Sequence, residues 1–176
     1  MVHVERLQPD QFTTRDRSTL TRIRAESFTV PWVEPVAHWA NAEVYFVARD
    51  EQGEIISSAG VLQRRVIVNN THEINIGAIG GVMTAVVARR HGYAGMLLGA
   101  AADYMRDDLG LRFGLIQTAN HNIHFYEALG WRQARVPMWF SQPGNIRRVT
   151  PENAMVLILT DQPWPTGDID MNGLPW

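Results

Sequence analysis

The chain of 176 residues contains no cysteine, which excludes disulfides and catalytic thiols on the protein side. It also lacks an apolar run of about 20 residues, the length that a membrane-spanning helix needs. The opening stretch, MVHVERLQPDQF, has no apolar core of the kind that marks a secretion signal. A formal net charge of -2 provides no basic excess for nucleic acid or an anionic membrane. We therefore expect a cytoplasmic protein without nucleic-acid or membrane partners.

Hydrophobic periodicity predicts one α+β domain over residues 1–176, with a central, mostly antiparallel sheet. Helices are expected at 13–28, from about 93 to 109, and at 121–130. Strands are expected at 2–7, 43–50, 54–68, 73–87, 112–119, 131–140 and 153–160. The tail, 161–176, is rich in proline, glycine and aspartate and shows no period. The apolar MWF within 131–140 could support a homodimer or belong to the core.

The stretch RRHGYAG, residues 89–95, lies between a predicted strand and a predicted helix. The first N–H groups of a helix are unpaired and carry a partial positive charge. Gly92 and Gly95 allow close approach of the backbone to a ligand, and Arg89, Arg90 and His91 add donors. Neither GxxxxGK[ST] nor GxGxxG is present. The stretch predicts a diphosphate-binding turn, the alternative being an ordinary glycine turn with solvated arginines.

The motif RRHGYA resembles the R/Q-x-x-G-x-G/A signature of the GNAT superfamily of acyltransferases, and FYEALGW follows at the expected distance. The resemblance implies a GNAT-like fold whose splayed strands bind acetyl-CoA, with no metal. The implied cofactor-binding residues are Val82, Met83, Thr84, Arg89, Arg90, His91, Gly92, Tyr93, Ala94 and Gly95. Their backbone groups would pair with the pantetheine arm and the diphosphate.

Tyr126 occupies the tyrosine position of the second motif, which implies that it protonates the leaving thiolate. A tyrosine of pKa about 10 can give a proton to a thiolate of pKa about 8.5 at small cost. The alternative is that its ring only packs beneath the helix.

Several patches more narrowly resemble the aminoglycoside 2'-N-acetyltransferases, including VLQRRVI, IGAIGGVMT, YMRDD and the tail ending in tryptophan. The implied function is acetylation of an amino-sugar amine, for example in a compact aminoglycoside antibiotic such as kasugamycin, which gives resistance. A polycationic acceptor needs carboxylates that are not already neutralised. The implied substrate-binding residues are Glu34, Gly80, Gln117, Glu152, Asp168, Asp170 and Trp176 with its carboxylate.

One position departs from the family pattern. Gly80 stands where that family has a glutamate thought to help deprotonate the amine. Glu73 lies on the same strand and His121 and His124 lie near Tyr126, but a water relay could serve instead. The alternative functions are acetylation of a protein or peptide amine, nodulation-type N-acylation, which the tail also resembles, and a non-catalytic acyl-CoA-binding module.

Overall fold

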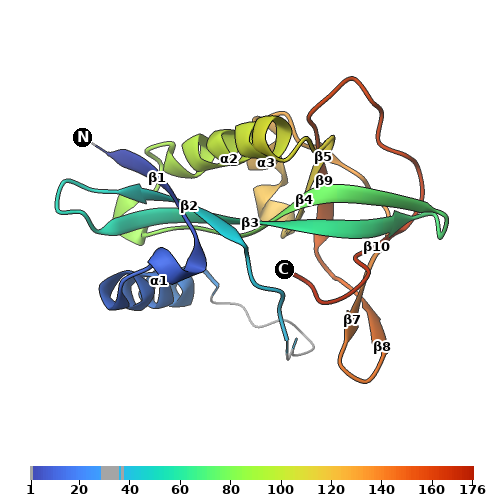
Figure 1. Ribbon diagram of the computed structural model, residues 1–176, viewed down its shortest axis with the longest axis horizontal. Helices are drawn as coiled ribbons and strands as arrows, with labels where there is room; N and C mark the ends of the chain where they lie inside the picture. The colour runs from blue at the N-terminus through green and yellow to red at the C-terminus, as the bar shows by residue number, and fades with distance from the viewer. Residues whose placement is uncertain (1, 29–35, 37) are drawn as a thin grey trace.

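The computed structural model describes residues 2–28, 36 and 38–176 (Figure 1). Its helices are α1 (Thr14–Ser27), α2 (Tyr93–Asp103) and α3 (Ile123–Glu127), with short turns η1 (Pro9–Gln11), η2 (Val86–Ala88) and η4 (Asn120–Asn122) and a π-helical turn η3 (Tyr104–Asp108). Its strands are β1 (His3–Leu7), β2 (Val44–Arg49), β3 (Ile55–Val68), β4 (His72–Thr84), β5 (Phe113–Thr118), β6 (Arg132–Gln133), β7 (Met138–Gln142), β8 (Ile146–Val149), β9 (Asn153–Ile158) and β10 (Ile169–Asp170). Among the described residues, no helix combines the length and apolarity that a membrane crossing requires.

The strands form one mixed sheet in the order β6-β9-β5-β4-β3-β10-β7-β8, and β2 joins β1 to the first half of β3. Neighbouring strands are antiparallel except for the pairs β4–β5 and β10–β7. The predicted α+β fold with a mostly antiparallel sheet is confirmed. The long β3–β4 ribbon runs through the middle of the molecule and carries elements on both of its faces (Figure 1).

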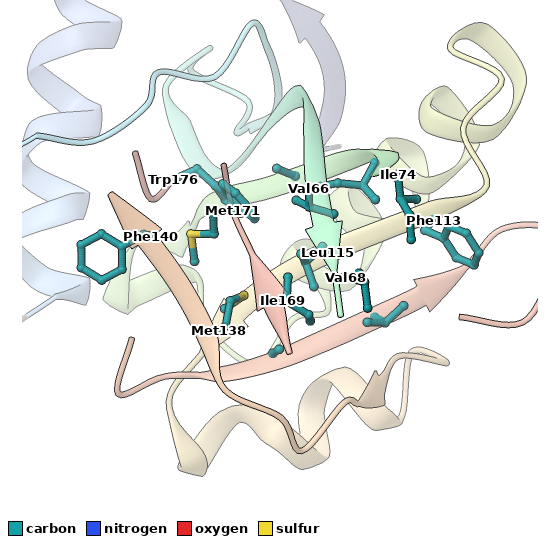
Figure 2. Packing of buried hydrophobic residues seen from close by; sticks show 14 of the residues in the cluster. Val66, Val68, Ile74, Phe113, Leu115, Met138, Phe140, Ile169, Met171 and Trp176 are labelled. Atoms are coloured by element: carbon teal, nitrogen blue, oxygen red, sulfur yellow. The ribbon is translucent and has the colours of Figure 1, made fainter. Parts of the chain in front are cut away.

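The sheet separates two sets of packed side chains, because neighbouring residues of a strand point to opposite faces. On one face, Ile79, Ile116 and Tyr126 pack with Leu97 and Leu98 of α2. On the other face, α1 covers one half of the sheet. The strands β7 and β10 fold back over the other half, where Met138 and Ile169 lie against Leu115 (Figure 2).

Helix α1 begins at a reciprocal cap that also joins it to the sheet. The N–H of Asp16 donates to the Thr13 hydroxyl at 3.1 Å, and the N–H of Thr13 donates to the Asp16 carboxylate at 3.0 Å. The buried Asp16 carboxylate also accepts a 2.6 Å bond from Arg49 Nη1, while Arg49 Nε donates to Glu5 at 2.8 Å. The hydrogen bond from Arg49 is the main reason that the pKa of Asp16 is lowered to about 2.

The second half of the chain differs from the prediction in three places. The single strand expected at 131–140 is divided into β6 and β7, because Arg135 has φ 51° and Pro137 lacks an N–H for the ladder. Strand β8 and the two-residue β10 were not predicted. Met138 and Phe140 are 1% and 2% exposed. Met138 and Phe140 therefore belong to the core, whereas Trp139 between them is partly exposed and lies under Arg147.

Two facing glycines stand where β4 and β5 pair. Gly77 is opposite Gly114, and the side chain of Met105, in the π-helical turn, lies across them. A Cβ atom on Gly77 would be 2.0 Å from Met105 Sδ, and one on Gly114 would be 3.1 Å from Met105 Cε. The thioether therefore occupies the volume that two strand side chains would otherwise fill.

Candidate functional site

The parallel strands β4 and β5 separate soon after they meet. Their pairing runs only from Gly77 to Ile79 on β4 and from Gly114 to Ile116 on β5. Beyond it, a register shift against β3 and a φ of 60° at Gly81 bend β4 away. Met83 and Thr84 remain paired with β3 on one side, and within the described chain no strand pairs with the other side of residues 82–84. The result is a splay whose β4 edge has no strand partner, although the carbonyls of Met83 and Thr84 accept bonds from the Ser57 hydroxyl and from Arg89 Nε, each at 3.1 Å.

The turn that follows β4 presents the N-terminus of α2 at one end of this splay. Arg90 has φ 65° and Gly92, the N-cap, has φ 80°, so both adopt the left-handed conformation. Gly92 has no side chain that could cap the helix, and therefore the first N–H groups of α2 are available to a ligand. Left-handed residues next to a helix N-terminus form a concave array of N–H groups that binds anions.

The side chains of the turn mostly hold its shape. Arg89 donates from Nε to the carbonyl of Thr84 at 3.1 Å and from Nη2 to the carbonyl of Glu26 at 3.2 Å. His91 Nδ1 lies 2.8 Å from the carbonyl of Arg89, and its ring stacks on Tyr93 with 5.7 Å between centroids. Arg90 is exposed. The groups of the turn that are available to an anion are therefore chiefly backbone N–H groups, with the exposed Arg90 beside them.

Tyr126 lies on the face of the sheet that α2 and α3 cover. Its side chain is 5% exposed and packs edge-on against Phe125 and Trp131. Its hydroxyl forms a hydrogen bond with Thr118, at the end of β5. Burial raises the pKa of Tyr126 well above its ordinary value, and the bond with Thr118 opposes this only in part. The phenol is thus a protonated, oriented donor at any ordinary pH.

Trp176 fills the opposite face of the splay and connects its two strands. Gln117 Nε2, on β5, donates to the Trp176 carbonyl oxygen at 2.8 Å. On β4, a Cβ atom at Gly80 would lie 3.0 Å from the Trp176 carbonyl carbon. Arg64 Nη2 donates to the carbonyl of Leu174 at 2.8 Å, and its guanidinium lies over the Trp176 ring. Gly80 is therefore needed for space, because a glutamate there would displace the tail.

Glu152 carries a carboxylate close to this arrangement. Its N–H donates to the Thr150 hydroxyl at 3.1 Å, and that hydroxyl donates to Gln117 Oε1 at 3.2 Å. Glu152 Oε2 is buried and accepts no hydrogen bond from the described part of the chain. Burial raises the pKa of Glu152, and the charge of His121 lowers it by less. A cation at Oε2 would relieve the cost of this burial.

The structure does not bring every expected substrate-binding residue to the splay. Asp168 is exposed, and its carbonyl accepts the N–H of Asn69 at the far end of the β3–β4 ribbon. The Asp170 carboxylate is already paired with Arg147 at 3.0 Å, so it is not a free acid for an ammonium group. Glu34 lies outside the described residues.

Two residues considered as the base that deprotonates the amine, Glu73 and His124, also lie away from the splay. Glu73 is exposed near the far end of β4 and pairs with Arg65 at 3.2 Å. His124 is almost fully exposed and contacts Glu127 on its own helix. A shallow hollow of about 550 Å³ at the β1 edge shares no residue with the splay. The roles of Thr118 and Thr150 were not predicted from the sequence, because neither residue belongs to a recognisable motif. Strand alternation would have placed Thr118 on the face of Tyr126.

The comparisons with known proteins agree with this geometry. Residues 13–134 match the family described as acetyltransferase (GNAT) domain, whereas no curated protein matches the chain significantly. The fold is similar to that of a GNAT family N-acetyltransferase (YhbS) from Escherichia coli in complex with CoA. The TM-score is 0.64 at 15% identity, over 98% of this chain and 89% of that one.

Two further structures have the same fold. A GNAT family acetyltransferase from Brucella melitensis in complex with acetyl-CoA gives a TM-score of 0.60 at 15% identity, over 96% of this chain and 94% of that one. An acyl-CoA N-acyltransferase from Pseudomonas aeruginosa gives 0.61 at 16% identity, over 89% and 99%. With a family match over more than half of its length and a splayed β4–β5 pair beside a helix N-terminus, the chain belongs to the GNAT acetyltransferase family and is an acetyl-CoA-dependent N-acetyltransferase.

Proposed function

We propose that the enzyme acetylates an amine of an amino sugar, in particular the 2'-amino group of an aminoglycoside of the kasugamycin type, and so gives resistance to the antibiotic. One observation carries the proposal. Glu152, connected by its N–H through Thr150 to Gln117, has a buried carboxylate oxygen that accepts no hydrogen bond from the described residues. Such an oxygen favours an ammonium group over a neutral or anionic partner.

The donor would bind from the side of α2. The N–H groups at the start of α2 would receive the diphosphate, and the free edge of Val82, Met83 and Thr84 would pair with the pantetheine arm. This places the thioester in the splay. The acceptor would then approach from the opposite face, where Trp176 forms a wall.

Tyr126 would act on the sulfur. As the amine nitrogen bonds to the thioester carbon and the carbon–sulfur bond breaks, the hydroxyl held by Thr118 would give its proton to the thiolate. Gln117 and Thr150 add neutral hydrogen-bonding groups on the acceptor side. An amino sugar offers hydroxyls to such groups beside its amine, whereas a simple polyamine does not.

The test is thiol release from acetyl-CoA with kasugamycin, kanamycin B, glucosamine, spermidine and a short peptide, with the product confirmed by mass spectrometry. All 16 basic residues counted as Lys+Arg are arginine, so acetylation of the enzyme's own lysine side chains cannot contribute to the signal. We expect turnover with the amino sugars. Turnover confined to the peptide or to spermidine would reject the proposed acceptor and leave the family assignment intact.

A further inference from the structure

The attacking nitrogen must lose a proton, and β4 supplies no carboxylate to receive it. Gly80 and the Trp176 carbonyl group occupy the acceptor side of that strand. Glu73, seven residues earlier, is about 23 Å away along an extended strand and is paired with Arg65. The proton acceptor must therefore come from another element.

Glu152 is connected to the acceptor face by hydrogen bonds. Ala154 of β9 pairs with Gln117 of β5, and Ala154 packs in the core cluster of the acceptor face. Glu152 lies in the bend directly before β9, two residues from Ala154. The bonds from Glu152 N–H to Thr150 and from Thr150 to Gln117 fix its backbone beside the residue that holds Trp176. Glu152 Oε2 itself is left without a bond from the described residues.

We propose that Glu152 accepts the proton that the acceptor's ammonium group loses and releases it to solvent. This inference rests on the function proposed above. The neutral amine then attacks the thioester carbon, and the carbon–sulfur bond breaks. The sulfur takes the proton of Tyr126, and the second proton released by the nitrogen as the amide forms replaces it. The net products are the acetylated amine, CoA thiol and one proton.

The surroundings of Glu152 suit a base. Its burial raises the pKa of the carboxyl above the ordinary value of 4.5, with His121 as the opposing positive charge. Thr150, which accepts the N–H of Glu152, and Gln117 of β5, which accepts from Thr150, are uncharged. A carboxylate with a raised pKa is a stronger base than an exposed one.

The experiment is the pH dependence of kcat/KM for Glu152→Gln, with the fastest acceptor of the panel above. Glu73→Gln is the matched control, because it neutralises an exposed carboxylate on β4. At neutral pH we expect Glu152→Gln to lower kcat/KM about 100-fold, as removal of a general base does. The deficit should shrink as the pH approaches the pKa of the amine, and acetyl-CoA affinity should stay unchanged. A deficit that is equal at every pH, or no deficit, would overturn the assignment.

A second variant tests the same group without touching it. His121→Asn removes a positive charge that lowers the pKa of Glu152, so the acid limb of the kcat/KM profile should move to higher pH. An acid limb that does not move would contradict the role of Glu152. Failure of every amino sugar in the panel would instead reject the proposed function, which is a different result from an active enzyme indifferent to Glu152.

Discussion

Replacing Tyr126 by phenylalanine removes one hydroxyl. Its buried surroundings make this hydroxyl a weaker acid than an exposed phenol. Burial raises the pKa of Tyr126 well above the ordinary value of about 10. Full transfer of its proton to a thiolate of ordinary pKa, about 8.5, is therefore more strongly uphill than it would be for an exposed tyrosine. The sequence-based expectation of a small cost is wrong for this environment. A phenolate cannot persist, so the proton must be replaced as it leaves.

We expect Tyr126→Phe to lower kcat by roughly 100- to 10,000-fold, the range for loss of a general acid, with the Kd of acetyl-CoA unchanged. The assay is steady-state thiol release, with calorimetry for acetyl-CoA. Tyr104→Phe is the control, because Tyr104 is half-buried in the π-helical turn and contacts Arg6.

The pH profile provides an independent check. A pKa raised above its ordinary value of 10 keeps Tyr126 protonated, so it contributes no alkaline limb to kcat up to pH 10. The stability that its neutral form provides is complete below pH 10 and is lost only as the pH rises through the raised pKa. A kcat unaffected by Tyr126→Phe would refute this reasoning, as would an alkaline limb near pH 10 that disappears in the variant.

Two further predictions concern the turn and the helix cap. Gly92→Ala places a Cβ at φ 80°, a strain of about 1–2 kcal/mol, and should raise the KM for acetyl-CoA about tenfold. Gly53→Ala imposes the same strain at φ 75° in a distant turn and should lower only the melting temperature; an equal change in KM would exclude a role for the α2 N-terminus. The lowered pKa of Asp16, from 3.8 to about 2, contributes about 2 kcal/mol to the free energy of unfolding above pH 4, and this contribution is lost as the pH falls toward 2. In urea unfolding at neutral and acid pH, Asp16→Asn should remove this pH dependence of the free energy of unfolding and weaken the link to Arg49. An unchanged pH dependence would contradict the role of Asp16.

The sequence predicted the elements with a strong local pattern. Thr13 and Asp16 signalled the start of α1, and the alternation along β3 and β4 signalled the long ribbon. Strand β10 has only two residues, held by pairing with β3 and β7. No local pattern encodes such a strand, because its partners are about 100 and 30 residues away.

The site was predicted unevenly for the same reason. The turn before α2 and Tyr126 belong to contiguous motifs, so a short stretch of sequence was sufficient to find them. The position of Trp176 against Gly80 depends on the path of the whole tail, and the bond from Thr150 to Gln117 joins residues that are 33 positions apart. Asp170 was expected to bind the acceptor, but its carboxylate is paired with Arg147. This ion pair forms only in the folded chain, so no pattern in the sequence indicated it.

The facing glycines where β4 and β5 pair also indicate how the width of the cleft is set. Met105 Sδ would lie 2.0 Å from a Cβ at Gly77, so the angle between the strands depends on how much volume the helix inserts at that point. Moving volume from the helix to the strand, as in Gly77→Ala combined with Met105→Ala, should preserve stability better than either change alone, because neighbouring substitutions couple. The packing of Met105 against the two glycines thus influences the angle between β4 and β5. Substitutions at this point should change the enzyme's tolerance for longer acyl groups without changing any residue that meets either substrate.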